Sequence, residues 1–283
     1  MKRYFLVATQ IGGLTRILCA KLEADQQKRA PALTRLMSAS SHGDIADAPG
    51  FRLETGRLTI AKPNLFNDPV NMLRIFEIAD SRNLDIHPDA LSAISRSLRK
   101  ITPHVRSDPA AASVFLNIIA SKNNPGRTLA LMSEVGLLGR FVPEFGRVVG
   151  QMQFNMYHHF TVDEHTLHAV DMISQIEHGR YEDEHPLSTL IFPKIINRRA
   201  LFLAMLLHDT GKGQGDQEEE GEKSAIEACA RLGLPAEEIE MIGWLVGHHL
   251  QMSDTAQKRD LGDPRTVATF ARLVGNLERL RLL

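Results

Sequence analysis

Apolar residues recur at helical spacing along most of this 283-residue chain. Leu14, Leu18 and Leu22 follow one another at steps of four, and Met72 and Phe76 repeat the same step farther on. Side chains three or four positions apart lie on one face of an α-helix, so these runs predict amphipathic helices. We therefore expect an all-α protein. The clearest helical segments of its second half are 163–178, 198–209 and 236–251.

One short stretch departs from the helical pattern. Residues 51–54 and 57–60 form two short runs with alternating apolar side chains, and Thr55-Gly56 lies between them. Alternation is typical of a half-buried strand, and a two-residue turn that contains glycine is typical of a β-hairpin. We expect one small hairpin near 51–60 within an otherwise helical region.

The histidines are distributed unevenly along the chain, and they become frequent after about residue 151. With 283 residues, 43% of them hydrophobic, the chain is long enough for two modest domains that each have a core. We expect a helical linker region at 1–150, which carries the hairpin, and a second domain at 151–283.

The composition argues against several classes of protein. The longest apolar runs, such as 201–207, are far shorter than the ~20 residues that a membrane span needs. Cys19 and Cys229 cannot form a disulfide framework, and no signal peptide precedes them, so a reducing cytoplasm is the simplest compartment. The net charge of −1 indicates no particular partner. Residues 1–36 hold seven Lys or Arg against two acids, which fits a solvated helix face better than a surface for nucleic acid.

The apolar helix predicted at 198–207 leads directly into the adjacent pair His208-Asp209. Neighbouring side chains on a helix point ~100° apart, but at the last turn both can converge on an ion beyond the helix end. A divalent metal suits mixed nitrogen and oxygen ligands, and an open site leaves positions for water and a phosphate. Lys212 would supply positive charge for the phosphate oxygens. By itself, however, such a pair is more often a helix cap with a hydrogen bond at the surface.

Two other helices strengthen the metal hypothesis. One presents His165 near its start, and the other ends in His248-His249. Three helices would then bring imidazole groups to one end of a bundle, which is how helical bundles usually build metal sites. The sequence therefore predicts a metal centre around His208 and Asp209.

The remaining polar residues of this half have simpler explanations. His158 and His159 fit a loop, and His168 fits a neighbour of the site one turn after His165. The acidic run 216–222 stands at the start of a helix, where negative charge favours the helix dipole. Helix capping is therefore the preferred interpretation of this run, and metal contact is the alternative.

Blocks of sequence around these histidines resemble a known family. The motif LHDTGKG at 207–213 is similar to the HD motif of the bifunctional uridylyltransferase/uridylyl-removing enzymes, which modify the PII nitrogen-signalling protein. Segments 151–166 and 248–260 are similar to two further blocks of the same HD domain. The region from residue 4 to 145 resembles the helical stretch that joins the family's transferase domain to its HD domain. The resemblance covers nearly the whole chain.

This resemblance implies a metal-dependent phosphohydrolase of nitrogen metabolism. The HD domain would hydrolyse the phosphodiester that joins UMP to a tyrosine of PII, with Mg²⁺ or Mn²⁺ as the metal. His208, Asp209 and Lys212 would be the catalytic residues. The metal ligands would come from His165, His208, Asp209, His248 and His249. Two alternatives stay open, a general HD-type nucleotide phosphohydrolase and a non-catalytic regulatory HD module.

The chain also departs from the family's pattern. The signature of the transferase domain does not occur, so no transfer of UMP is expected. Gln217 stands where the family usually has a histidine, so the chain would hold one metal only or use an acid such as Glu220. The family's last metal-binding aspartate should come from a helix beyond Leu283, so we expect an HD domain truncated at its C-terminal end, with the ACT domains missing as well. Asp254 and Asp260 are possible substitutes.

Overall fold

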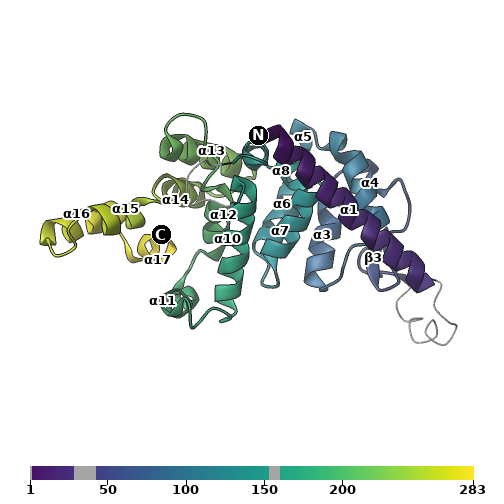
Figure 1. Ribbon diagram of the computed structural model, residues 1–283, viewed down its shortest axis with the longest axis horizontal. Coiled ribbons are helices and arrows are strands. Elements are labelled where there is room, and N and C mark those ends of the chain that lie inside the picture. The colour runs from purple at the N-terminus through teal and green to yellow at the C-terminus, as the bar shows by residue number, and fades with distance from the viewer. Residues whose placement is uncertain (1, 29–42, 153–159) are drawn as a thin grey trace. The chain divides into compact units, whose positions relative to one another are not determined.

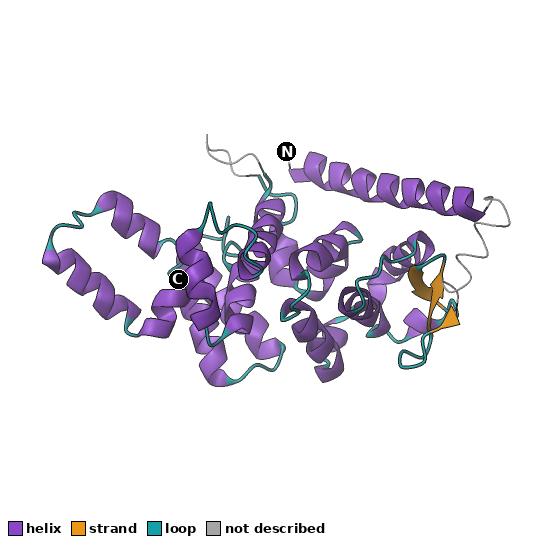
Figure 2. Cartoon of the chain, turned by 90° about the horizontal axis from the view of Figure 1, so that it is seen from below, coloured by secondary structure: helices purple, strands orange, loops and turns teal. Residues whose placement is uncertain are grey.

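The computed structural model describes residues 2–28, 43–152 and 160–283. Helices dominate these residues, and the strands are confined to a small sheet (Figures 1 and 2). The expected all-α class is therefore confirmed. The chain forms two compact units, Met1–Thr161 and Val162–Leu283. The division between them, at 161/162, falls eleven residues after the predicted domain boundary at 150/151.

The first unit is a set of mostly short helices around a core rich in phenylalanine. Phe76, Phe115, Phe141 and Phe145 are fully buried. Several helices begin with proline at the first turn, where its missing N–H group costs no hydrogen bond. The helices are α1 (Lys2–Lys28), α3 (Asn71–Ser81), α4 (Pro88–Ser97), α5 (Pro103–Arg106), α6 (Pro109–Ile119), α7 (Pro125–Glu134), α8 (Leu137–Phe141) and α9 (Pro143–Val148), with 3₁₀ turns at Leu65–Asn67 and Leu98–Lys100.

The long helix α1 lies against α4 and α7 of the same unit. Gly13 faces α7 so closely that an added Cβ would lie 3.0 Å from the carbonyl oxygen of Glu134. The leucines that predicted this helix, Leu14, Leu18 and Leu22, are all exposed. The periodicity therefore predicted the helix correctly, but its leucine stripe is not the face that packs on the unit.

The sheet of the first unit has three antiparallel strands in the order β1 (Gly43–Asp44), β2 (Phe51–Glu54), β3 (Arg57–Ile60). The predicted hairpin is β2–β3, in which Phe51 pairs with Ile60. Its turn residues Thr55 and Gly56 both have positive φ, at 52° and 75°, as the tight hairpin turn requires. The strand β1 was not predicted, because two residues are too few to show an alternating pattern.

The second unit is built around α12 (Arg198–Leu207), which packs against three other helices of the unit. These are α10 (Val162–Glu177), α13 (Gln217–Arg231) and α14 (Ala236–Gly247). The three helical segments predicted from periodicity coincide with α10, α12 and α14 to within a few residues. The other elements are α11 (Pro186–Ile191), a 3₁₀ turn at Phe192–Lys194, α15 (Gln251–Lys258), α16 (Pro264–Val274) and α17 (Leu277–Leu282).

Within the described residues, no helix is both long enough and apolar enough to span a membrane. Cys19 is exposed on α1 and Cys229 is buried in α13, and both are free thiols.

Candidate metal centre

The central pair of the site, His208-Asp209, follows α12 directly. The side chain of Asn197 caps the start of this helix by accepting a hydrogen bond from the backbone N–H of Ala200 at 3.1 Å. At the other end, the hydroxyl of Thr210 donates to the carbonyl oxygen of Leu207 at 2.7 Å. This bond satisfies one of the carbonyl groups that a helix end leaves unpaired. The turn that carries His208 and Asp209 is therefore fixed by local hydrogen bonds.

The same turn lies directly against the start of α13. A Cβ added at Gly211 would overlap the carbonyl oxygen of Gln217 and the backbone nitrogen of Gly221. No larger residue fits at this position without moving one of the two segments. Gly211 thus brings the end of α12 and the start of α13 together beside the site.

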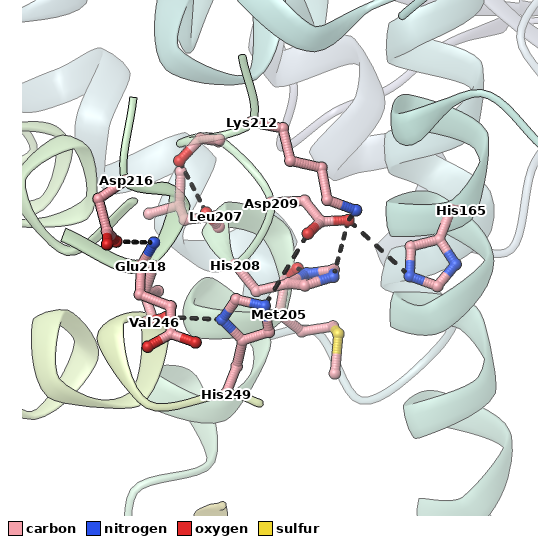
Figure 3. Close-up of polar contacts among 11 residues, drawn as sticks. His165, Met205, Leu207, His208, Asp209, Lys212, Asp216, Glu218, Val246 and His249 are labelled. Atoms are coloured by element: carbon pink, nitrogen blue, oxygen red, sulfur yellow. Dashed lines mark hydrogen bonds and ion pairs between the residues drawn. The ribbon is translucent and has the colours of Figure 1, made fainter. Parts of the chain in front are cut away.

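Three side chains from two helices converge here and form a group that could hold a metal ion (Figure 3). Nε2 of His208 lies 3.2 Å from Oδ2 of Asp209, and Nε2 of His165 lies 4.0 Å from the same oxygen. One ligand atom from each of the three residues lies within 4.8 Å of the others. Asp209 and His208 are buried, and the side chain of His165, on α10, is 41% exposed. A buried donor set with one solvent-facing side is typical of an open metal site.

Backbone carbonyls orient the imidazole rings. Nδ1 of His208 lies 2.7 Å from the carbonyl oxygen of Met205, and Nδ1 of His249 lies 2.7 Å from that of Val246. A carbonyl oxygen can only accept, so each Nδ1 carries a proton, and Nε2 is the ring atom that faces the centre. Nε2 of His249 faces Oδ1 of Asp209 at 3.9 Å. Such hydrogen bonds behind the ring are usual for histidines that bind metals, so these residues fit a divalent ion.

The ammonium group of Lys212 lies 2.6 Å from Oδ2 of Asp209, and both side chains are buried. Burial alone would raise the pKa of Asp209, but the hydrogen bonds and charges of His208 and Lys212 outweigh burial and hold the pKa well below its usual range. Asp209 is therefore a carboxylate at neutral pH. Lys212 is placed beside the centre, where its charge can act on an anion bound there.

The structure separates the roles of the two adjacent histidines that follow α14. Burial lowers the pKa of His249, and the charge of His208 lowers it further, against the opposing effects of Val246 and nearby carboxylates. His249 is thus neutral at pH 7, the form that can bind a metal. The ring of His248 instead stacks on Trp244, with centroids 4.7 Å apart, and its Nδ1 lies 2.9 Å from the carbonyl oxygen of Trp244. Among the described contacts of Asp209, the partner from this pair is His249.

The two aspartates considered as substitute ligands make contacts of their own. Asp254 pairs with Lys258 at 2.8 Å, and Asp260 is exposed and accepts a hydrogen bond from the backbone N–H of Gly262. Neither belongs to the ligand group found in the described residues.

The acidic run at the start of α13 divides between two roles. The side chain of Asp216 accepts hydrogen bonds from the backbone N–H groups of Glu218 and Glu219, so it is the predicted helix cap. The negative charge of Glu218 favours the protonated form of His249 and so opposes the lowering of its pKa by burial. This electrostatic partner was not singled out from the sequence, where Glu218 looks like any member of the run. His168 is exposed on α10, and His158 and His159 lie outside the described residues.

Comparisons with known proteins match one domain model within each unit. A model of the HD domain matches residues 162–280, and a model of the uridylyltransferase GlnD third domain matches residues 51–141. The chain is 58% identical over 287 aligned residues to the bifunctional uridylyltransferase/uridylyl-removing enzyme of Phenylobacterium zucineum. It is 55% identical to that of Caulobacter vibrioides and 48% identical to that of Azospirillum brasilense.

Each of these comparisons covers 100% of this chain but only 30% of the relative. The resemblance seen in the sequence blocks is thereby confirmed. Along its whole length the chain is similar to one part, about 30%, of the bifunctional uridylyltransferase/uridylyl-removing enzymes, and within that part it matches the models of the GlnD third domain and of the HD domain.

Proposed function

We propose that the second unit is a metal-dependent phosphodiesterase that removes UMP from a uridylylated tyrosine of the PII protein. The observation that carries this proposal is the convergence of His165, His208 and Asp209 within an HD domain whose relatives are named uridylyl-removing enzymes. The transferase activity in the relatives' name is not proposed for this chain, because the sequence lacks the motif that implies it.

The residues of the centre would divide the work between holding an ion and neutralising charge. His165, His208 and Asp209 would hold Mg²⁺ or Mn²⁺, because their donor atoms lie within 4.8 Å of one another. His249 would join them, since its Nε2 faces Oδ1 of Asp209 at 3.9 Å. Such an ion supplies Lewis acidity at a phosphate and activates water for attack at neutral pH. Lys212, fixed beside Asp209, would offset the negative charge that grows on the phosphate oxygens.

The reaction balances as a simple hydrolysis. The oxygen of water forms a new bond to phosphorus, and the bond from phosphorus to the tyrosine oxygen breaks. One proton of the water ends on the tyrosine oxygen, and the products are UMP and unmodified tyrosine. The exposed side of the centre, where His165 lies, would admit a tyrosine at the surface of a partner protein.

The direct test is release of UMP from uridylylated PII in the presence of Mn²⁺. We expect release by the unaltered chain and a loss of at least about a hundredfold in His165→Gln and Asp209→Asn, since each variant removes a proposed ligand. Asp183→Asn is the matched control, because Asp183 is an exposed acid of the same unit outside the ligand group. His165 is partly exposed, so His165→Gln should destabilise the fold less than Asp209→Asn does.

Three results would count against the proposal. Equal release by wild-type chain and His165→Gln would remove the centre from the reaction. Hydrolysis of free nucleotides or cyclic phosphodiesters, with none of uridylylated PII, would favour the general phosphohydrolase. Absence of bound metal and of any Mn²⁺ effect on stability would favour a regulatory module.

A further inference from the structure

A cavity outside the candidate metal centre lies between α15 and α16. Its volume is about 340 Å³, at the lower end of the roughly 300–1,000 Å³ that small-molecule sites occupy. None of the proposed metal ligands lines it. The lining residues are Gln251, Thr255, Arg259, Arg265, Thr266, Thr269, Phe270 and Leu273.

The cavity is built by one face of each helix. Gln251 and Thr255 are four residues apart on α15, as are Thr266 and Phe270 on α16, so each pair shares a face. Figure 1 shows the two helices in succession at the end of the second unit. The helical spacing thus places these four side chains on the faces of α15 and α16 that line the cavity.

Two arginines give the cavity its charge. The guanidinium groups of Arg259 and Arg265 form no hydrogen bond or ion pair with another residue of the described second unit. Neighbouring cations are engaged elsewhere, since Lys258 pairs with Asp254 at 2.8 Å. Asp263, which precedes α16, accepts a hydrogen bond from the backbone of Arg265 and caps the helix. Two unpaired guanidinium groups on one cavity favour an anion, and above all a phosphate, because both can donate paired hydrogen bonds to it.

The cavity also has an apolar wall. Phe270 and Leu273 are half-buried and form an apolar wall, and Thr255 and Thr269 bring hydroxyl groups beside it. A half-buried phenylalanine can stack on a flat ring, and a base that stacks on an aromatic side chain gains affinity whatever its sequence. A small molecule that offers both a phosphate and a flat ring is a nucleotide.

We propose that the cavity between α15 and α16 binds a mononucleotide, with its phosphate at Arg259 and Arg265 and its base against Phe270. None of the side chains of the metal centre, Lys212 included, lines this cavity. A phosphate at the arginines is therefore not the one at Asp209. The site is a second nucleotide site, which would make the second unit responsive to a free nucleotide such as the product UMP.

The test is calorimetric titration of the chain without metal, with UMP, AMP, uridine and inorganic phosphate in separate experiments. Using the His165→Gln background as well keeps binding at the metal centre out of the measurement. We expect saturable binding of the nucleotides and much weaker binding of uridine and of phosphate alone, because each lacks one half of the recognition.

Substitutions in the cavity sharpen the test. Arg259→Gln and Arg265→Gln should each weaken nucleotide binding about tenfold to a hundredfold, the effect of losing one charge-assisted hydrogen bond. Phe270→Leu should weaken it about tenfold by removing the stacking surface. Lys258→Gln is the matched control, since it removes the same charge one residue away and outside the cavity, and it should bind as the unaltered chain does.

Three outcomes would overturn the proposal. One is the absence of saturable UMP binding, and another is phosphate binding as tight as that of UMP. The third is an equal loss in Lys258→Gln and Arg259→Gln, which would mean non-specific attraction by charge. Hydrolysis of uridylylated PII is not part of these measurements, so the second site and the proposed reaction fail or succeed separately.

Discussion

Asp209 is the residue on which the polar contacts of the centre converge. Its carboxylate faces Lys212 at 2.6 Å and the rings of His208, His165 and His249 at 3.2–4.0 Å. Of these side chains only His165 is more than one third exposed. The charges of the buried side chains are therefore balanced by one another and not by solvent. The stability of the metal-free protein should therefore be sensitive to the loss of any one of the buried side chains.

We predict that Asp209→Asn lowers the free energy of unfolding by about 3 kcal/mol, because it removes the carboxylate charge 2.6 Å from the buried ammonium of Lys212. The double variant with Lys212→Met should recover part of this loss, since it also removes the buried positive charge. Urea unfolding of the two single variants and the double variant would measure the coupling. Additive effects would show that the two side chains do not interact energetically.

The lowered pKa of His249 implies a change of folding stability with pH. Burial lowers its pKa in the folded chain, so the unfolded chain, with a histidine pKa near about 6.5, binds the proton more readily. As pH falls through about 6.5, protonation favours the unfolded state, and the folded chain loses stability until the folded pKa is passed. His249→Gln should lose less stability than the unaltered chain over this window in thermal unfolding. A larger loss in the variant would contradict the assignment.

At the scale of the element, the contact between the end of α12 and the start of α13 depends on one glycine. Gly211→Ala should destabilise the second unit by about 1–3 kcal/mol, because the methyl group overlaps backbone atoms that cannot rotate away. It should also weaken Mn²⁺ binding, since the turn that carries His208 and Asp209 must shift. Gly12→Ala in α1 is the control with the opposite sign, because nothing lies within 4 Å of its added Cβ and alanine favours a helix. Thermal unfolding and Mn²⁺ titration of both variants would measure the two effects.

Much of the element order could be predicted from the sequence, and the limits have physical causes. The spacing of apolar residues predicted α10, α12 and α14 because burial of one face dictates that spacing. It could not show that the Leu14–Leu22 stripe of α1 is exposed, because periodicity does not say which neighbours a helix has. Nor could it separate His248 from His249, since adjacent side chains differ by ~100° and the outcome depends on where α14 ends. The choice of metal ligands stays a prediction.

At the scale of the whole molecule, the chain has two compact units and spans 30% of its relatives. The centre lies entirely within residues 162–283, so a bound ion should stabilise that unit first. At a free Mn²⁺ concentration 100 times the dissociation constant, the gain is about 2.7 kcal/mol. Hydrogen exchange should then slow in α10, α12 and the end of α14, and remain unchanged in α3 and α6. Equal slowing in both units would show that the ion acts on the chain as a whole.

The stacking of His248 on Trp244 gives the second unit an optical signal of its own. Trp244 is the only tryptophan of the chain, and the guanidinium group of Arg279 also lies over its ring at 4.6 Å. The indole ring therefore contacts both Arg279 of α17 and His248, the residue next to His249. A small movement at the end of α14 would change these contacts. Intrinsic fluorescence can follow events at the centre without a label, while the first unit, which has no tryptophan, contributes no indole emission.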